Sequence, residues 1–286
     1  MYLQYFGLRA APFSIAPDPQ YLYLSDQHRE ALAHLLYGVG QGGGFVLLTG
    51  DVGTGKTTVS RCLLQQLPEQ TEVAFIINPL QSPVDMVASV CDELRVPQAA
   101  AGASIKHHVD RLTAHLLETH RRGYRTVVII DEAQNLPVET MEQIRLLTNL
   151  ETDEAKLLQL VLIGQPELNA KLALPELRQF AQRITARYHL GPLREGETRA
   201  YVRHRLAVAG VYEDIFPDWA LRRIHEASGG VPRLVNVLCD RVLLGLYAES
   251  AKQLRPRHIR NAIREVLPPP LATPLLGRWL PRLRRG

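Results

Sequence analysis

The chain has 286 residues, enough for about two domains. Hydrophobic residues make up 46% of it and charged residues 22%, which is typical of a folded globular protein and excludes a disordered chain. The net charge of +4 resides in the acid-free segment 268–286, which holds four arginines, so the neutral remainder gives no electrostatic argument for a nucleic-acid partner.

The cysteines and the first residues of the chain bear on the cellular compartment of the protein. Cys62, Cys91 and Cys239 lie far apart and form no C-x-x-C pair, so we expect buried thiols in a reducing compartment. The first residues lack a basic region followed by an apolar run, so no secretory signal is predicted. No apolar run approaches the roughly 18 residues of a membrane helix, so no bilayer span is predicted.

Residues 5–23 combine prolines with aromatic side chains and predict an ordered, irregular lead-in. A helix is expected from the cap residue Ser25 to Val39, and it should stop in the glycine run near residues 40–44. The apolar residues 45–48 then predict a short buried strand.

This strand leads into the most informative stretch, a G-x-x-x-x-G-K-T sequence followed by a predicted helix over residues 59–67. The glycines allow a tight turn in which successive N–H groups point at one centre, and the helix adds its positive end. The loop is therefore predicted to bind the di- or triphosphate of a nucleotide. Its residues are Gly50, Asp51, Val52, Gly53, Thr54, Gly55, Lys56, Thr57 and Thr58.

Two side chains of this loop have defined chemistry. Lys56 can reach the β- and γ-phosphates as a mobile point charge, and the Thr57 hydroxyl is placed to ligate Mg²⁺. A glycine-rich turn without a ligand is the alternative, and the strand and helix on either side count against it. A segment just before a phosphate loop can wrap the base, so Phe13 and its neighbours either pack on adenine or belong to the core.

Beyond the loop, alternating strands and helices continue to residue 190. Residues 73–77 predict a strand that ends at Asn78, residues 82–94 and 104–121 predict helices, and residues 126–130 predict another buried strand. Asp131 and Glu132 close that strand. If it lies beside the strand that feeds the phosphate loop, Asp131 can hold Mg²⁺ through water and Glu132 can polarise the attacking water, whereas a surface turn is the alternative.

A helix over 137–150 and a strand over 158–164 follow, and Gln165 at the end of this strand is placed to touch the γ-phosphate or the water. Residues 188–190 predict a last strand. Five strands alternating with helices predict an α/β fold with a parallel sheet and right-handed crossovers.

Only helices are predicted after residue 192, over 197–209, 217–227, 231–248 and 257–266. They should form a small second domain. The domains are therefore predicted over 1–191 and 192–267, and the proline-rich segment 268–286 is predicted to be an extended, basic linker.

A phosphate loop, a strand ending in Asp-Glu, a strand ending in a polar residue and a helical second domain together resemble the AAA+ ATPase family. The resemblance implies a P-loop fold in which Mg²⁺ and ATP lie between a base domain and a helical lid, and in which subunits assemble into rings or filaments. It also implies that the Asp-Glu strand flanks the polar-ended strand. By the same resemblance Gln165 is sensor one, Asn78 is the switch that turns Glu132, and Arg233 of the G-G-V-P-R sequence is sensor two on the phosphates.

The family resemblance also implies an arginine finger that reaches a neighbouring subunit from just before the last strand. Arg183 fits this place best, and Arg178 and Arg187 compete with it. Each of them could equally be a solvated helix residue. A finger supplied in trans would make hydrolysis depend on assembly.

Several further segments are similar to the ExeA/GspA ATPases of bacterial type II secretion, and the similarity runs from about residue 5 to residue 267. The segments are Y-F-G-L at 5–8, P-D-P at 17–19, L-Y-L-S at 22–25, G-Q-P-E-L at 164–168 and G-G-V-P-R-L at 229–234. The resemblance implies a cytoplasmic ATPase at the inner membrane, followed by a membrane helix and a periplasmic peptidoglycan-binding domain. It implies a membrane partner of the ExeB/GspB type and a role in assembling the secretin. We expect the chain to be the cytoplasmic part of such a protein.

Transposition ATPases, which form ATP-dependent filaments on DNA, are the alternative within the same AAA+ branch. A basic stripe of Arg121, Arg122 and Arg125 would suit DNA, but the neutral body of the chain counts against it. A threading unfoldase fits less well, because residues 80–83 carry no aromatic-hydrophobic-glycine loop. No H-E-x-x-H sequence is present, so metal chemistry beyond Mg²⁺ is not expected.

Overall fold

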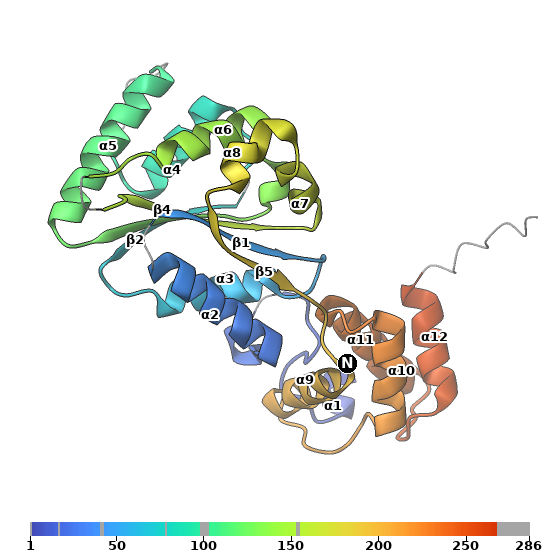
Figure 1. The fold of residues 1–286 in the computed structure, drawn as a ribbon. Helices are drawn as coiled ribbons and strands as arrows, with labels where there is room; N and C mark the ends of the chain where they lie inside the picture. The colour runs from blue at the N-terminus through green and yellow to red at the C-terminus, as the bar shows by residue number, and fades with distance from the viewer. Residues whose placement is uncertain are drawn as a thin grey trace, which may run out of the picture.

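A computed structural model describes residues 2–16, 18–40, 43–77, 79–97, 103–152 and 155–267. Figure 1 shows two lobes. The larger lobe is a sheet with helices on both faces, and the smaller lobe consists of helices from the C-terminal part of the chain and the N-terminal lead-in. Pro17, Asn78 and segment 268–286 lie outside the described residues.

The sheet contains five parallel strands, as the sequence predicted, and their order is β2-β3-β4-β1-β5. Each central strand is a continuous apolar run because helices cover both faces of the sheet. The edge strand β5 is longer than predicted and alternates between exposed and half-buried residues. The strands are β1 (Gly44–Gly50), β2 (Thr71–Ile76), β3 (Arg125–Ile130), β4 (Leu158–Gly164) and β5 (Ile184–Leu190).

The order of the strands corrects one expectation. The strand that ends in Asp131 and Glu132 does not lie beside β1, because β4 is inserted between β3 and β1. Val161 of β4 pairs with Ile129 on one side and Val46 on the other, so the three strands end at one edge of the sheet. The acids, the polar end of β4 and the phosphate loop are therefore close despite the insertion, as the family resemblance implied.

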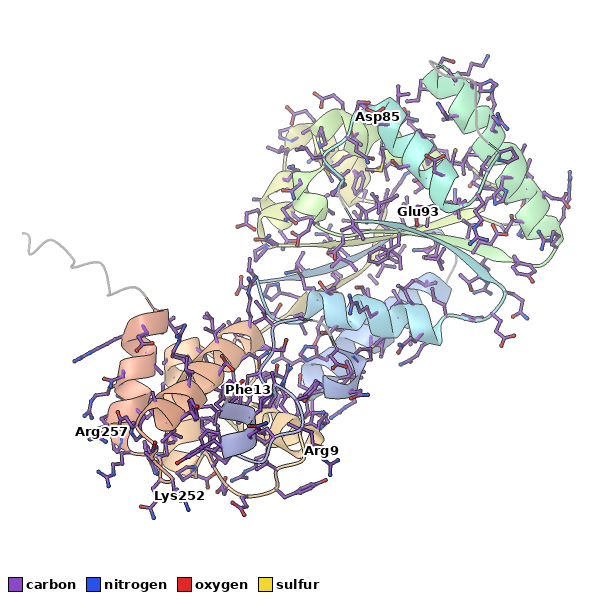
Figure 2. The ribbon with its side chains drawn as sticks, turned by 180° about the vertical axis from the view of Figure 1, so that it is seen from behind. Arg9, Phe13, Asp85, Glu93, Lys252 and Arg257 are labelled. Carbon is purple, nitrogen blue, oxygen red and sulfur yellow. The ribbon has the colours of Figure 1, made fainter. Side chains whose placement is uncertain are left out.

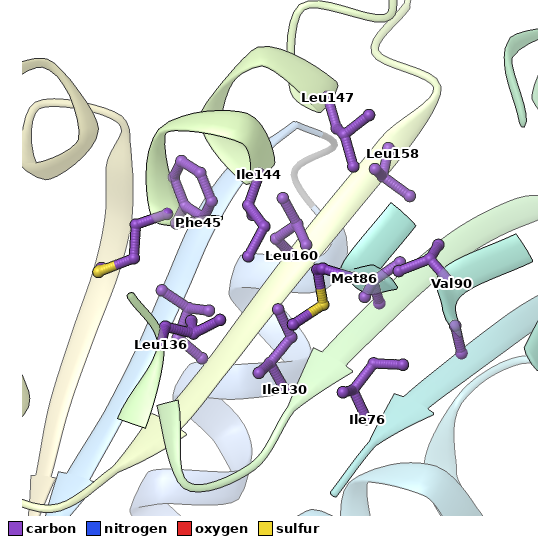
Figure 3. Close-up of a cluster of buried hydrophobic side chains, with 14 of the residues drawn as sticks. Phe45, Ile76, Met86, Val90, Ile130, Leu136, Ile144, Leu147, Leu158 and Leu160 are labelled. Carbon is purple, nitrogen blue, oxygen red and sulfur yellow. The ribbon is translucent and has the colours of Figure 1, made fainter. Parts of the chain in front are cut away.

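Two apolar cores hold helices against the faces of the sheet. One core joins the sheet to α4 (Pro83–Glu93), α5 (Ile105–Arg121) and α6 (Val138–Leu147), and Figure 3 shows its side chains, with Met86 between sheet and helices. The other core joins the opposite face to α2 (Asp26–Gly40) and α3 (Lys56–Gln66). These cores fix the start of α3 at the edge where the strands end.

The helical lobe is built from the four helices predicted after residue 192. They are α9 (Glu195–Val208), α10 (Asp218–Ser228), α11 (Pro232–Ala248) and α12 (Pro256–Val266). The short elements elsewhere are α1 (Tyr2–Tyr5), η1 (Pro19–Tyr21), η2 (Ala133–Asn135), α7 (Glu167–Leu172), η3 (Pro175–Leu177) and α8 (Arg178–Ala181).

The lead-in packs on the helical lobe and not on the sheet. Leu8, Phe13 and Tyr21 are buried in the core of that lobe, and Figure 2 shows Phe13 among its helices. The rings of Phe13 and Phe216 meet edge to face with centroids 5.9 Å apart. This packing corrects the assignment of the lead-in to the first domain, and the other predicted boundaries stay predictions.

The three cysteines and the apolar content of the helices were both subjects of prediction from the sequence. Cys62, Cys91 and Cys239 are free and buried, as predicted. Within the described ranges, no helix is both long enough and apolar enough to cross a membrane.

Candidate nucleotide-binding site

The phosphate loop joins the end of β1 to the start of α3. Gly53 and Gly55 have φ of 84° and 104°, a region that favours glycine. Gly55 is the N-cap of α3 and has no side chain that could bond the first amides of the helix. These amides are therefore available to an anion, which the positive end of the helix also attracts.

The helical lobe touches the loop directly. The backbone N–H of Arg233 donates to the Gly53 carbonyl at 3.3 Å, so α11 begins on the phosphate loop. A Cβ on Gly53 would lie 2.6 Å from the Cβ of Arg233, which leaves no room for another residue type at this position. The exposed Arg233 side chain lines the cavity beside the loop.

Lys56 is buried at the centre of the loop. Its ammonium donates to the Gly50 carbonyl at 2.7 Å and to the Asp51 carbonyl at 3.0 Å, which leaves one N–H for another acceptor. Burial lowers the pKa of Lys56, and the nearby carboxylates of Glu132 and Asp131 oppose this shift. The charge is thus held in a partly dry position where an incoming phosphate would bind it strongly.

The two acids differ in their surroundings. Asp131 is buried, which raises its pKa, and its Oδ1 accepts the backbone N–H of Glu132 at 2.9 Å. Glu132 has a φ of 51°, an uncommon conformation for a residue other than glycine. It lines the cavity with Lys56 and Gln165.

Two amides hold the Glu132 carboxylate. The Nε2 groups of Gln134 and Gln165 donate to Glu132 Oε2 at 2.6 and 3.1 Å, and these bonds lower the pKa of Glu132. The predicted residues Glu132 and Gln165 are thus in contact. The carboxylate stays charged near neutral pH, and its second oxygen remains available to a water molecule.

Gln134 was not predicted as a site residue from the sequence. Its side chain also accepts the backbone N–H of Gln165 at 3.0 Å, so it links the ends of β3 and β4. Gly164 makes room for this amide, because a Cβ there would lie 2.9 Å from Gln134 Oε1. In the sequence, Gln134 is visible as an amide two residues after Glu132. Its contact with the Glu132 carboxylate depends on the turn η2, which the sequence did not predict.

A cavity of about 480 Å³ lies between the loop and the helical lobe. Phe13 does not line it, which corrects the expectation that Phe13 packs on adenine. The neighbouring residues Ile15 and Ala16 do line it, together with Tyr23. The Ile15 side chain is 62% exposed, so the lead-in presents an apolar wall to the cavity.

Arg205 of α9 is a second residue of the cavity that the sequence did not predict. It is buried and lines the cavity, and it donates to the Pro12 carbonyl and, at 3.1 Å, to the Ser14 carbonyl. Its Nη1 donates to the Tyr201 hydroxyl at 2.8 Å. Arg205 therefore fastens the lead-in to the helical lobe next to Ile15.

The three candidate finger residues lie around the start of β5. Arg183 donates from Nη1 to Thr148 Oγ1 at 2.7 Å and to the Arg145 carbonyl at 3.4 Å, so neutral acceptors position its charge without neutralising it. Arg187 donates to the Ala181 carbonyl at 3.2 Å, and Arg178 is exposed on α8. The acceptors of these hydrogen bonds do not line the cavity described above.

Two further expectations concern Asn78 and the basic stripe. Asn78 lies outside the described residues. The end of β2 lies beside Asp131, whose N–H donates to the Ile76 carbonyl at 2.9 Å. In the stripe, Arg121 pairs with Glu118 at 3.6 Å. The Arg125 guanidinium donates to the Gly40 carbonyl and Arg122 lies over the Tyr124 ring.

The donors at the edge of the sheet fit Mg²⁺. Asp131 offers a carboxylate and Thr57 an exposed hydroxyl, and Mg²⁺ is usually bound by one or two such oxygens together with substrate phosphates. In the part of the chain that the structure describes, no group of three or more His, Cys, Asp and Glu side chains could hold a metal alone.

Comparison with known proteins agrees with this geometry. Residues 39–172 match the AAA domain family. General secretion pathway protein A of Aeromonas hydrophila is 56% identical over 266 residues, which are 93% of this chain and 48% of that protein. The chain thus spans about half the length of the curated relative it matches.

Solved structures share the fold at low sequence identity. Cdc6p from Pyrobaculum aerophilum has a TM-score of 0.71 and 20% identity, covering 90% of this chain and 70% of that one. The RuvB Holliday junction branch migration motor of Thermotoga maritima has a TM-score of 0.56 and 18% identity, covering 84% and 68%. The chain therefore has the P-loop fold of these structures, contains an AAA domain over residues 39–172, and is similar along most of its length to general secretion pathway protein A.

Proposed function

We propose that the chain binds Mg²⁺ and ATP in the cavity between its lobes and hydrolyses the ATP to ADP and phosphate. The observation that supports this most directly is that Lys56, Glu132, Gln165 and Arg233 all line one cavity at the amino end of α3. Each comes from a different element, so their convergence is a property of the fold and not of a local motif.

The loop amides and Lys56 would hold the phosphates, and Arg233 would contact them from the helical lobe. Thr57 and Asp131 would hold Mg²⁺, which supplies positive charge against the phosphate oxygens. The Glu132 carboxylate would orient a water molecule for attack on the γ-phosphorus and accept its proton while the bond to the β-phosphate breaks. Gln165, bonded to Glu132, would orient the same water or the γ-phosphate.

The lead-in would form the wall for the base. Ile15, Ala16 and Tyr23 supply apolar surface beside the cavity, and Arg205 holds the backbone that carries Ile15. An adenine ring placed there would contact both lobes, so that nucleotide binding and lobe orientation would be coupled.

Gln134→Ala should change the pH dependence of hydrolysis. The Gln134 amide contributes most to the lowered pKa of Glu132, so its removal raises that pKa towards the usual value. A base must be deprotonated to act, and the acid limb of the kcat profile should therefore move to higher pH. At pH 7 the carboxylate is charged in both proteins, so kcat should fall there by up to about tenfold only because Glu132 is less well oriented. Steady-state ATPase assays from about pH 4 to about pH 7 test this, because the ordinary pKa of a glutamate is about 4.3.

Asn135→Ala is the matched control, because it removes an exposed amide from the same turn. Its profile should coincide with that of the parent protein. An unchanged acid limb in Gln134→Ala would show that this amide neither tunes nor orients Glu132.

We propose that self-association completes the site and that Arg183 is the residue supplied in trans. Its guanidinium is positioned by Thr148 and keeps donors for a neighbour's phosphates. The ATPase rate per subunit should rise with protein concentration, and Arg183→Ala should abolish this rise, with a loss on the order of 10³-fold at high concentration. Arg178→Ala is the control and should keep the rise; loss in Arg178→Ala alone would reassign the finger.

We infer that the hydrolysis serves type II secretion at the cytoplasmic face of the inner membrane, with a membrane partner of the ExeB/GspB type. The identity of 56% to general secretion pathway protein A supports this role. Replacing the matched region of the Aeromonas relative by this chain should restore secretin assembly in cells that lack the relative, and the same chimera carrying Glu132→Gln should not.

A further inference from the structure

His28 of α2 lies against the underside of the phosphate loop. Its side chain is buried, with 4% exposure for the residue, yet its ring reaches the wall of the cavity. The ring Nε2 is 3.0 Å from the Thr54 carbonyl oxygen, and Nδ1 is 2.7 Å from Ser25 Oγ. None of the roles described above uses this histidine.

The partners of the ring define its tautomer. A carbonyl oxygen can only accept a hydrogen bond, so Nε2 must carry the proton that is donated to Thr54. Nδ1 of the neutral ring then accepts from the Ser25 hydroxyl. Burial lowers the pKa of His28, which keeps this neutral form at physiological pH.

The bond to Thr54 determines where the next amide points. In a planar trans peptide the C=O of one residue and the N–H of the following residue point in opposite directions. Because the Thr54 carbonyl points towards α2, the Gly55 N–H points away from α2. That direction leads to the other side of the loop, where Lys56 and the first amides of α3 lie.

The peptide plane between Thr54 and Gly55 needs a partner that fixes its orientation, because Gly55 itself does not fix it. Glycine at a φ of 104° tolerates many orientations of the preceding peptide, including a flipped one. Thr54 is anchored by bonds from its own N–H and Oγ1 to the Asp51 carbonyl, but these leave its carbonyl free to turn. A Cβ on Gly55 would lie 2.5 Å from His28 Nε2, so the glycine also lets the ring approach closely enough to bond.

We propose that His28 is a positioning residue for the phosphate groups of a nucleotide: its Nε2–H holds the Thr54 carbonyl and thereby turns the Gly55 N–H into the phosphate-binding nest. The ligand class is a nucleoside di- or triphosphate, and the inference rests on the proposed function. The gain is preorganisation, since an amide that is already oriented costs no free energy to order when the phosphate arrives.

Matched substitutions test the bond itself. The amide nitrogen of glutamine occupies the place of Nε2, whereas the shorter asparagine reaches only the place of Nδ1. His28→Gln should bind ADP within about threefold of the parent, and His28→Asn and His28→Ala should bind it about tenfold more weakly, as expected for one lost hydrogen bond. Calorimetric titration with ADP measures these affinities. The titration is run at about pH 7.5, roughly one unit above the ordinary pKa of histidine, so that the His28 ring of the parent is neutral.

A second readout needs no ligand. In the ligand-free protein, the ¹H–¹⁵N resonance of Gly55 should move in His28→Asn and stay near its parent position in His28→Gln, because only asparagine frees the peptide plane. Ser25→Ala, which removes the Nδ1 partner but not the bond to Thr54, should bind ADP nearly as the parent does. Equal ADP affinities of the Gln and Asn variants would overturn the inference and leave His28 with a space-filling role.

The proposed function has its own control in the same titration. Lys56→Ala should lose ADP affinity whatever His28 does, because the ammonium contacts phosphate directly in the proposal. If Lys56→Ala weakens binding while the Asn variant of His28 does not, only the positioning role fails. If Lys56→Ala leaves binding unchanged, the proposed function fails and the inference fails with it.

Discussion

Glu132→Gln should reduce ATP turnover by about 10²- to 10⁴-fold, the range expected when a general base is removed. The substitution keeps the size of the side chain, and its amide oxygen can still accept from Gln134 and Gln165. The charge that polarises water is lost, while the groups that face the phosphates stay in place. ATP affinity should therefore remain within about threefold of the parent, which corresponds to less than about 0.7 kcal/mol.

Single-turnover ATPase assays and equilibrium binding of ATP separate these two effects. Glu118→Gln is the matched control, because this exposed carboxylate on α5 pairs with the neighbouring Arg121 and does not line the cavity. It should turn over ATP as the parent does. Retained turnover in Glu132→Gln would mean that another group activates the water.

The parts of the site that could be predicted are those whose geometry is local. Gly50 to Thr58 are contiguous, and the left-handed glycines and the start of α3 follow from that short sequence. Asp131, Glu132 and Gln165 could be predicted for a related reason. Parallel strands end at a common edge of a sheet, so a polar residue after an apolar run is placed there whatever the strand order is.

The strand order itself could not be derived from the pattern. Apolar runs show that β1, β3 and β4 are buried but do not show which pairs with which, so the insertion of β4 emerged only from the register of Val161 with two partners. The family resemblance supplied one part of this order, the pairing of β3 with β4. The physical pattern of a single chain does not contain it.

The lead-in was the least predictable part because it lacks a helical or strand period. Its aromatic residues were equally compatible with packing on adenine and with packing in the core. Contacts with residues about two hundred positions away decide between the two, as in the pair of Phe13 and Phe216. Gln134 and Arg205 were missed for the same reason. Their partners are brought to them by the turn η2 and by α9, and neither sequence position differs from an ordinary surface residue.

Lys56→Ala should have the largest effect on binding. The buried ammonium uses two donors on loop carbonyls and has one left for phosphate, and hydrogen bonds to charged groups contribute about 1.5–3 kcal/mol each. Together with the lost attraction between unlike charges in a partly dry site, this predicts at least about a hundredfold loss of ATP affinity. Turnover at subsaturating ATP should fall by at least the same factor. Equilibrium titration with a fluorescent ATP analogue measures the first quantity, and Lys252→Ala, an exposed lysine of the helical lobe, is the control.

The stability of the same variant distinguishes loss of a ligand contact from loss of the fold. A lowered pKa of Lys56 in the folded state means that folding disfavours the charged ammonium, so this group opposes stability below its unfolded pKa and the penalty disappears as pH rises above that value. At neutral pH, Lys56→Ala removes this penalty, and the ligand-free variant should unfold at the same or a higher temperature than the parent. ATP and Mg²⁺ should raise the unfolding temperature of the parent and of Lys252→Ala but not that of Lys56→Ala, because only a bound ligand stabilises the folded state. A variant that melts lower without ligand would show that Lys56 supports the fold of the loop, and its weak binding would then say nothing about phosphate contact.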